Sequence, residues 1–258
     1  MKKQKLSDFS YWETRYKTYS KLDDVKSSRT AYKIVQFIKS IGLDTGSWVL
    51  DAGCGAGNIT KIVRDNFRHS NVVGIDLSQK MIDAAKFREE KGLRFFCEDF
   101  FSYISEINPF FNLMIMSLVI HHFTNGLDQK ALDKAHSCLK KNGNIIIAEA
   151  IPPSDQIFDY YQQIFSIKED RNCYALADLL KMVRVAGFYD IKFQTYPFDI
   201  RLLSWLNDNT LTQAKKDLLY SMHVSASEEF KKAYCMKALS GGNYRLRCKM
   251  VLIAGRKS

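Results

Sequence analysis

The sequence predicts an α/β fold in which helices cover both faces of a mostly parallel sheet. Strand-like apolar segments alternate with helix-like segments between residues 45 and 151, which is the order of elements that builds parallel sheets. The segment FFNLMIMSLVI at residues 110–120 is continuously apolar, as a strand buried on both faces should be. With 258 residues and a hydrophobic content of 46%, the chain suffices for one large domain with a modest cap.

The elements of the first part of the chain follow from local patterns. Residues 5–40 are expected to be a mostly helical, aromatic-rich lead-in, with apolar side chains at helical spacing between residues 32 and 41. Further helices are expected from Ile59 to Phe67, over residues 78–90 with Ser78 as the cap, and around residues 129–139 with a stop at Lys141-Asn142-Gly143. The predicted strands are SWVLDAG at 47–53, NVVGID at 71–76, LRFFCED at 93–99, FFNLMIMSLVI at 110–120 and NIIIAEA at 144–150.

The second part of the chain has a different pattern. A helix at residues 176–187 ends at a glycine, and strands are expected at residues 188–196 and 246–257. Residues 152–175 and 197–242 interrupt this order with polar, helix-like sequence, and we expect them to form a helical lid over the active site. The predicted division is a helical lead-in at 1–44, a core at 45–151, and a remainder of the core at 152–258 that carries the two lid insertions.

The composition bounds the class of protein and its partners. The formal net charge of +10 favours anionic partners, but the lysines are scattered and are interpreted mainly as a solvated surface. The six cysteines lack C-x-x-C spacing, so neither a disulfide framework nor a zinc knuckle is predicted, and a reducing, cytoplasmic setting fits best. No apolar stretch is long enough to span a membrane, and the first residues lack the apolar run of a secretory signal.

The strongest chemical signal is the segment VLDAGCGAGNIT at residues 49–60. Its glycines at 53, 55 and 57 stand between a strand and a helix, where they let the backbone pass close to a ligand. The dinucleotide fingerprint G-x-G-x-x-G fails because its sixth position is Asn58, and a phosphate-loop G-K-[ST] is absent. Nineteen residues after Gly57, Asp76 ends a strand, and its carboxylate can accept hydrogen bonds from both ribose hydroxyls of a nucleoside.

Together these segments resemble the class I S-adenosylmethionine (SAM)-dependent methyltransferases, over roughly residues 45–150 and the final strand. The matching pieces are DAGCGAG at 51–57, GIDLS at 74–78, CEDF at 97–100, MSLVIHHF at 116–123 and LKKNGNI at 139–145. The resemblance implies a Rossmann-like, doubly wound, mostly parallel sheet of seven strands with SAM as the cofactor. The predicted lid is then built from insertions into that fold.

The resemblance also implies which residues hold SAM. Gly53, Cys54 and Gly55 would line the methionine part of SAM, and Asp51 would act through the amino group of SAM. Asp76 would hold the ribose. The other implied contacts are Leu77 and Met81 on the adenine, Asp99 and Phe100 on its polar edge, and Ser117 beneath the sulfur. In many small-molecule members, aromatic and basic residues of the lead-in close over the methionine end. The candidates here are Tyr11, Arg15, Tyr19 and Arg29, and an arginine would pair with the SAM carboxylate.

For the chemistry, the candidates are His121, His122 and Glu149. Methyl transfer is an in-line displacement, so the protein must align the nucleophile and exclude water, and a neutral oxygen or nitrogen nucleophile also needs a base. The histidines follow the fourth strand and Glu149 ends the fifth, so we predict a His–Glu dyad with His122 or His121 as the base. No metal site is predicted, because the histidines lack H-x-x-x-H spacing and only Glu149 suits a catechol-type magnesium site.

The leading hypothesis is methyl transfer to an O, N or C atom of a small aromatic or apolar metabolite. It rests on the absence of an appended RNA- or protein-reading segment and on a lid rich in aromatic residues, which would enclose such a substrate. The expected substrate contacts are Tyr161, Phe165, Arg171, Tyr174 and His223. Two alternatives stay open: a methyltransferase acting on RNA or protein, which the positive charge favours mildly, and a SAM-binding protein with a non-methyl-transfer or interaction role.

Overall fold

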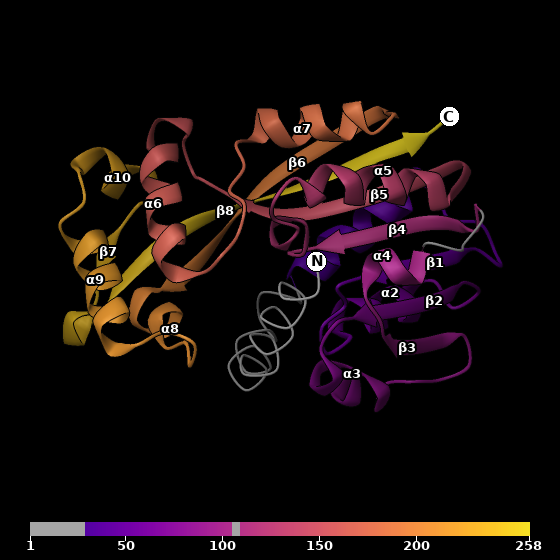
Figure 1. Cartoon of the computed structure of the whole chain (residues 1–258), viewed down its shortest axis with the longest axis horizontal. Helices are drawn as coiled ribbons and strands as arrows, with labels where there is room; N and C mark the ends of the chain where they lie inside the picture. The colour runs from indigo at the N-terminus through magenta and orange to yellow at the C-terminus, as the bar shows by residue number, and fades with distance from the viewer. Residues whose placement is uncertain (1–28, 105–108) are drawn as a thin grey trace.

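The computed structural model describes residues 29–104 and 109–258, which fold around one central β-sheet (Figure 1). Seven strands follow the order β3-β2-β1-β4-β5-β8-β6, and a very short strand, β7, pairs with β8. The predicted α/β architecture is therefore confirmed, with one short strand added. The strands are β1 (Trp48–Ala52), β2 (Asn71–Asp76), β3 (Leu93–Cys97), β4 (Phe111–Ser117), β5 (Leu139–Ile151), β6 (Phe188–Arg201), β7 (Lys237–Ala238) and β8 (Tyr244–Lys257).

Strands β1 to β5 are paired in parallel, whereas β8 lies antiparallel between β5 and β6. The chain winds outward from β1 through β2 to β3, and then returns to the other side of β1 as β4. The order of strands reverses there, and in sheets of this kind ligands bind outside the carboxyl ends of the strands at the point of reversal. The sheet topology therefore directs attention to the ends of β1, β2 and β4.

Helices cover both faces of the sheet because each carries an apolar stripe toward it. One face packs against the helix over residues 29–41, α2 (Asn58–Asn66) and α3 (Gln79–Lys86), with Ile34, Val63 and Ile82 among the buried contacts. The opposite face packs against α4 (Phe100–Ile104), α5 (Leu127–Cys138) and α7 (Leu176–Val185). Strand β4 lies between the two layers, and residues 113–116 are fully buried, as the apolar run predicts.

Two predicted helix boundaries can be compared with the structure. Ser78 caps α3, since its hydroxyl accepts a hydrogen bond from the backbone N–H of Met81 at 3.3 Å. The helix expected to run to Leu139 ends one residue earlier, at Cys138, and Leu139 already pairs with Phe111 in the sheet. The Lys141-Asn142-Gly143 segment is therefore not a helix stop but an irregularity within β5, where the register with β4 shifts.

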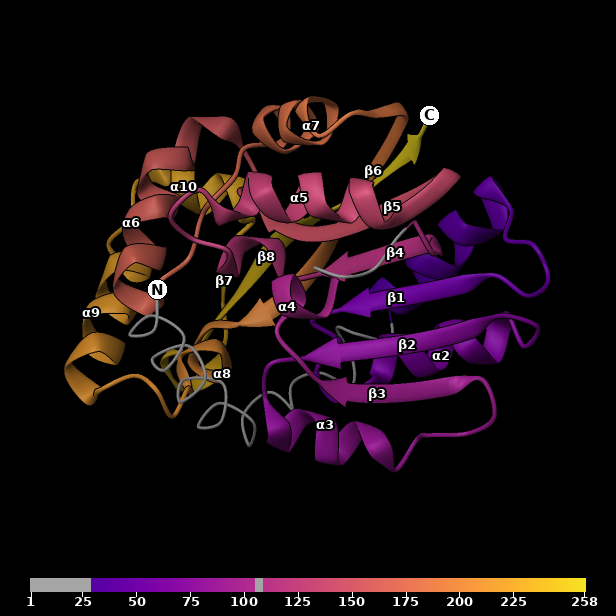
Figure 2. The same cartoon turned by 45° about the vertical axis from the view of Figure 1, so that its right-hand side comes forward.

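A second group of helices, here called the helical lobe, lies beside the core (Figure 1). It comprises α6 (Phe158–Lys168), α8 (Leu202–Leu206), α9 (Gln213–Val224) and α10 (Glu228–Ala233), packed around their own apolar cluster. In Figure 2 the arrowheads of β1, β2 and β3 point toward this lobe, so the lobe faces the edge at which ligands are expected. No helix in residues 29–104 and 109–258 has the length and apolarity needed to cross a membrane.

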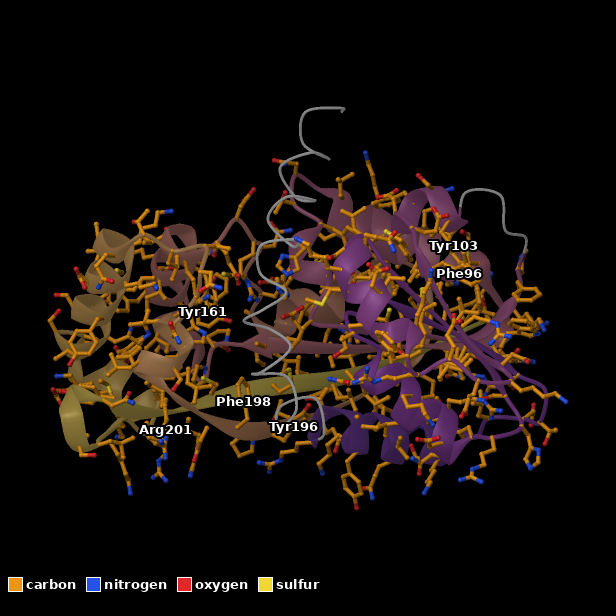
Figure 3. The ribbon with its side chains drawn as sticks, turned by 90° about the horizontal axis from the view of Figure 1, so that it is seen from below. Phe96, Tyr103, Tyr161, Tyr196, Phe198 and Arg201 are labelled. Carbon is orange, nitrogen blue, oxygen red and sulfur yellow. The ribbon has the colours of Figure 1, made fainter. Side chains whose placement is uncertain are left out.

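Strands β6 and β8 join the lobe to the core. The helix-like insertion was expected to start at residue 197, but β6 continues through Pro197, which pairs with Lys249, and ends only at Arg201. Proline is tolerated at this position because β6 is an edge strand of the sheet. Tyr196, Phe198 and Arg201 follow one another along β6 from the core toward the lobe (Figure 3).

Candidate active site

The glycine-rich segment after β1 forms a tight loop held against the end of β2. The backbone N–H groups of Gly53 and Cys54 both donate to the carbonyl oxygen of Ile75, at 2.8 and 2.9 Å. Gly57 then takes up a left-handed conformation and caps α2. The loop is therefore a connection between β1 and α2 that crosses directly over the end of the neighbouring strand.

The glycines of this loop serve different needs. A Cβ atom at Gly53 would lie 2.5 Å from the side chain of Val119, so the close approach there is to another part of the protein. Gly55 has a φ of +53°, and a Cβ atom built on it meets no atom of residues 29–104 and 109–258 within 4 Å. The expectation that the glycines make room for a ligand thus fits Gly55, whereas at Gly53 both the positive φ of +72° and the packing against Val119 require a glycine.

The carboxylate of Asp76 lies beneath the loop at the end of β2. One oxygen accepts a hydrogen bond from the backbone N–H of Gly55 at 2.9 Å, and the other accepts one from the N–H of Ser78, also at 2.9 Å. Two backbone donors thus set the orientation of this half-buried carboxylate. Asp76 and the open side of Gly55 lie together, as the sequence predicts for a nucleoside site. The contact with the ribose itself stays a prediction.

Asp51, in β1, is buried beneath the same loop with 1% of its surface exposed. Thr60 in α2 donates its hydroxyl hydrogen bond to the Asp51 carboxylate at 2.6 Å. Burial raises the pKa of Asp51 to about 7, against the lowering effect of Thr60 and with a further rise from the charge of Asp76. The buried partner Thr60 was missed in the sequence, although it lies in the first turn of the predicted helix.

The other predicted cofactor residues lie around this loop, and their contacts with SAM stay predictions. Met81 and Phe100 are buried and Leu77 and Ser117 are partly exposed. Asp99 caps α4, because one of its oxygens accepts hydrogen bonds from both the backbone N–H and the hydroxyl of Ser102 at 3.0 Å.

The lead-in candidates can be compared only in part with the structure. Arg29 is exposed, and its guanidinium lies 5.9 Å from the ring centre of Tyr196 in β6. Tyr11, Arg15 and Tyr19 lie outside the described residues. Their expected role at the methionine end of SAM stays a prediction.

The chain turns sharply after β4 and brings two histidines to the edge of the sheet. Leu118 adopts a φ of +54°, a conformation that leucine rarely takes and that is common at functional sites. A short 3-10 helix, Ile120–His122, follows. The side chain of His121 is buried, His122 is partly exposed, and their ring centres lie 3.9 Å apart.

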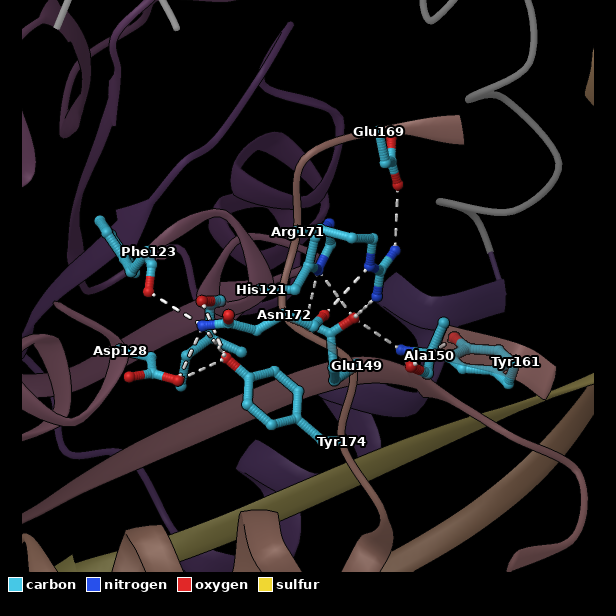
Figure 4. A network of polar contacts seen from close by, with 11 residues as sticks. His121, Phe123, Asp128, Glu149, Ala150, Tyr161, Glu169, Arg171, Asn172 and Tyr174 are labelled. Carbon is cyan, nitrogen blue, oxygen red and sulfur yellow. Dashed lines mark hydrogen bonds and ion pairs between the residues drawn. The ribbon is translucent and has the colours of Figure 1, made fainter. Parts of the chain in front are cut away.

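His121 and Glu149 contact each other, as the sequence predicts for a His–Glu dyad (Figure 4). Nδ1 of His121 lies 2.8 Å from both carboxylate oxygens of Glu149, which is fully buried at the end of β5. Burial would raise the pKa of Glu149, but His121 and Arg171 outweigh it, so the pKa is lowered and the group is a carboxylate at neutral pH. A carboxylate only accepts hydrogen bonds, so Nδ1 carries the proton.

Burial and the charge of Arg171 lower the pKa of His121, although Glu149 opposes them. At neutral pH the ring is therefore uncharged. Since Nδ1 holds its single proton, Nε2 carries a lone pair, which is the state a general base needs. Whether His121 or His122 acts as a base stays a prediction.

The segment between α6 and α7 lies within the expected lid insertion at residues 152–175 and contacts this pair, through individual contacts that the sequence did not predict. Arg171 donates from Nη2 to Glu149 at 3.3 Å and from Nη1 to Glu169 at 3.2 Å. The backbone N–H of Asn172 donates to the carbonyl oxygen of His121 at 2.8 Å. No local pattern indicates the contacts with Glu149 and His121, because they join residues that are more than 20 positions apart and depend on the path of the chain.

The remaining predicted substrate residues lie in packed surroundings. Tyr161 donates its hydroxyl hydrogen bond to the carbonyl oxygen of Ala150 at 3.2 Å, and its ring packs against Phe165 in α6. Tyr174 donates to Asp128 at 3.0 Å and belongs to the core beside α5. His223 is buried inside the helical lobe, where its Nδ1 lies 2.7 Å from the carbonyl oxygen of Leu219, one turn earlier in the same helix. Substrate contact by these residues stays a prediction, and the position of His223 lends it no support.

No group of three or more His, Cys, Asp and Glu residues within 29–104 and 109–258 is arranged to hold a metal ion. All six cysteines fall within these ranges, and each is a free thiol. The polar network drawn in Figure 4 joins the His121 imidazole, the Arg171 guanidinium and the carboxylates of Glu149 and Glu169.

Comparisons with known proteins point to the same part of the chain. Residues 49–143 match a family described as a methyltransferase domain. The demethylmenaquinone methyltransferase of Thermotoga maritima is 26% identical over 144 residues, which make up 49% of this chain and 60% of that protein. The malonyl-[acyl-carrier protein] O-methyltransferase of Acetivibrio thermocellus is 28% identical over 118 residues, covering 45% of this chain and 39% of that protein. The chain thus spans less than two thirds of either relative.

Among solved structures, the YcgJ protein of Bacillus subtilis is similar, with a TM-score of 0.74 and 21% identity. The likeness covers 86% of this chain and 96% of that one. At this identity the similarity concerns the fold, and it extends beyond the residues of the methyltransferase domain into the second half of the chain.

Proposed function

We propose that this chain, whose residues 49–143 match a methyltransferase domain, transfers the methyl group of SAM to an O, N or C atom of a small molecule. The observation that carries this proposal is the arrangement at the edge of the sheet. The open side of Gly55 and the Asp76 carboxylate lie together at the strand reversal, and the helical lobe faces them. SAM is bound over the loop, and the acceptor lies between the loop and the lobe.

In this proposal His121 is the general base for an acceptor that must lose a proton. Its hydrogen bond to Glu149 holds Nδ1–H and leaves Nε2 as the proton acceptor. The sulfonium of SAM is already an activated donor, so the protein contributes alignment, exclusion of water and removal of the proton. His122, whose ring contacts that of His121, is the alternative base.

An aromatic or apolar acceptor is the preferred class. Tyr161 and Phe165 pack against each other on the helical lobe, close to the end of β5, and aromatic side chains suit such an acceptor. The two curated relatives are named for demethylmenaquinone and for malonyl-[acyl-carrier protein] as acceptors. Quinone-like, phenolic and acyl compounds are therefore the first acceptors to test.

Cofactor binding is tested first, by calorimetric titration with SAM and with S-adenosylhomocysteine. We expect Asp76→Ala to weaken both titrations at least tenfold, because the variant removes the carboxylate expected to hold the ribose. Asp83→Asn, an exposed change in α3, serves as the matched control and should bind like the parent chain. No heat of binding and no rise in melting temperature at saturating SAM would sink the proposal.

Turnover is then measured with isotopically labelled SAM and the acceptor panel. If His121 is the base, His121→Asn should lower kcat by about 10²–10⁴-fold at saturating acceptor, which is the usual contribution of a general base. His122→Asn distinguishes the neighbouring ring in the same assay. An unchanged kcat in both variants means that neither histidine removes a proton in the rate-limiting step.

Nucleic acid is a second candidate acceptor, favoured by the formal net charge of +10. Lysine and arginine contacts to phosphates release counterions, so such binding weakens steeply with salt. Labelled SAM incubated with tRNA and ribosomal RNA at two salt concentrations separates this case. Transfer of label to RNA but to none of the small molecules would replace the leading proposal.

A further inference from the structure

Arg171 is a buried cation at the centre of the polar network, with only 5% of its side chain exposed (Figure 4). It lies in the segment that links α6 to α7, and its guanidinium contacts Glu149 at 3.3 Å and Glu169 at 3.2 Å. The central carbon of the guanidinium, Cζ, also lies 4.4 Å from the ring centre of Phe165. The guanidinium is thus engaged by two carboxylates and an aromatic ring of the protein itself.

The two carboxylates that Arg171 contacts have different further roles. Glu149 also contacts His121, whereas Glu169 is the C-cap residue of α6, at the start of the segment that holds Arg171. Removing one partner of a buried ion pair leaves an uncompensated charge, and the nearest titratable group responds by changing its protonation. Here that group is His121.

We infer that Arg171 is a positioning residue, which holds Glu149 in the place and charge state that keep the His121 imidazole neutral and ready to accept a proton. This inference rests on the proposed role of His121 as the base. With Arg171 present, Glu149 already has a permanent cation at contact distance, which it shares with Glu169, so an imidazolium is less favoured as its partner. Without Arg171, Glu149 would take its counter-charge from His121, and a protonated His121 cannot act as a base.

The backbone of the same segment reinforces this arrangement. The N–H of Asn172 donates to the carbonyl oxygen of His121, so adjacent residues hold the histidine and its carboxylate partner. The side chain of Asn172 also donates to Asp128 in α5 at 2.9 Å. The segment is thus tied to the core at several points, and Arg171 has little freedom to leave Glu149.

The charged and titratable groups that face His121 can be named from each packed element. Glu149 in β5 and Glu169 at the end of α6 raise its pKa, whereas Arg171 and burial lower it. His122 contacts it through the ring. Glu169→Gln should therefore have the opposite effect on His121 from Arg171→Gln, which gives a second variant in case the loss of Arg171 prevents folding.

The test is a direct titration of His121 by NMR, on the full chain with ¹³C-labelled histidine and no acceptor present. The resonance is assigned with His121→Asn. We expect Arg171→Gln to raise the pKa of His121 by about 1 unit or more, the usual effect of a charge at contact distance. Arg171→Lys keeps a cation and should return the pKa toward that of the parent chain, whereas Glu169→Gln should lower it.

Lys168→Met is the matched control for removing a buried cation. Lys168 is also buried, contacts a carboxylate of Asp208 at 3.2 Å and lies 4.8 Å from the ring centre of Trp205, but it belongs to the lobe. This variant should leave the His121 titration unchanged. The resonance of His223, buried in the same lobe, is an internal control that should not move in Arg171→Gln.

The outcomes separate this inference from the proposed function. An unmoved His121 pKa in both Arg171→Gln and Glu169→Gln overturns the inference, whatever the enzyme does with SAM. An equal shift in Arg171→Gln and Arg171→Lys also overturns it, because the charge would then be irrelevant and only packing would matter. If the pKa shifts as expected but His121→Asn keeps full turnover, the inference about charge stands and the role of His121 as a base fails.

Discussion

Replacing Asp51 by asparagine should stabilise the protein at neutral and alkaline pH. Burial raises the pKa of the Asp51 carboxyl from 3.8 to about 7. The rise is about 3 units, and each unit corresponds to about 1.4 kcal/mol of difference between folded and unfolded chain. Ionised Asp51 therefore lowers the free energy of unfolding by up to about 4 kcal/mol above pH 7.

The sign of the pH dependence follows from where the proton is bound. Below about pH 4 the carboxyl of Asp51 is protonated in both states, so the parent chain and Asp51→Asn should be similarly stable. Between pH 4 and pH 7 the folded chain retains a proton that the unfolded chain has lost, so the parent chain loses stability as the pH rises. The amide does not titrate, and Thr60 can still donate its hydrogen bond to it.

The assay is urea unfolding of both proteins at pH 5, 6, 7 and 8, followed by far-UV circular dichroism. Groups other than Asp51 titrate alike in both proteins, so the difference in the free energy of unfolding isolates this carboxyl. It should grow with pH and level off above pH 7. A difference that is absent at pH 8, or that is the same at all four pH values, would refute the reasoning. In the same variant SAM should bind more weakly, if Asp51 meets the amino group of SAM as proposed.

Two further changes test the loop and the lobe. Gly55→Ala should weaken SAM binding in calorimetry while costing about 1–2 kcal/mol of stability, because its φ is positive but its surroundings are open; parent-like SAM binding would contradict the proposed placement of the cofactor. Gly53→Ala should destabilise more strongly in urea unfolding, because its Cβ would lie 2.5 Å from Val119. Lys168→Met should lower the free energy of unfolding by about 3–5 kcal/mol, because it breaks the buried ion pair between Lys168 and Asp208. The double variant Lys168→Met/Asp208→Asn should recover part of this stability. No recovery would argue against the ion pair as the cause.

The sequence was informative where structure is decided by neighbouring residues. The alternation of apolar strands with helices predicted the sheet, and the Ser78 cap and the glycine after α7 marked helix ends that the structure contains. The glycine loop and Asp76 were found because their spacing reflects a strand, a turn and a second strand in fixed order. Such signals are local in the sequence, so they can be found in one sequence without knowledge of the tertiary structure.

The interpretation was weaker where long-range packing decides. The contact of Arg171 with Glu149, which is 22 residues away in the sequence, was not predicted, and its expected contact with substrate stays a prediction. Pro197 suggested the end of a strand, yet β6 continues because the edge of a sheet tolerates a residue without an N–H group. The close packing of Gly53 against Val119 was also not visible in the sequence, and the expected place of Gly53 beside SAM stays a prediction.

The hairpin of β6 and β8 has a consequence for how this protein can diversify. The segment that carries α8, α9 and α10 leaves the sheet at Arg201 and re-enters beside it, where Arg201 pairs with Arg245. Because the two ends of this insertion are adjacent, it can be exchanged as one unit, here called the cassette, without changing the spacing or register of β6 and β8. The part of the helical lobe formed by α8, α9 and α10 can therefore be exchanged as a unit. Helix α6 packs against these helices from outside the insertion, so its contact residues would have to change with them. Grafting this cassette between relatives is a direct route to changing acceptor preference while keeping the same donor site.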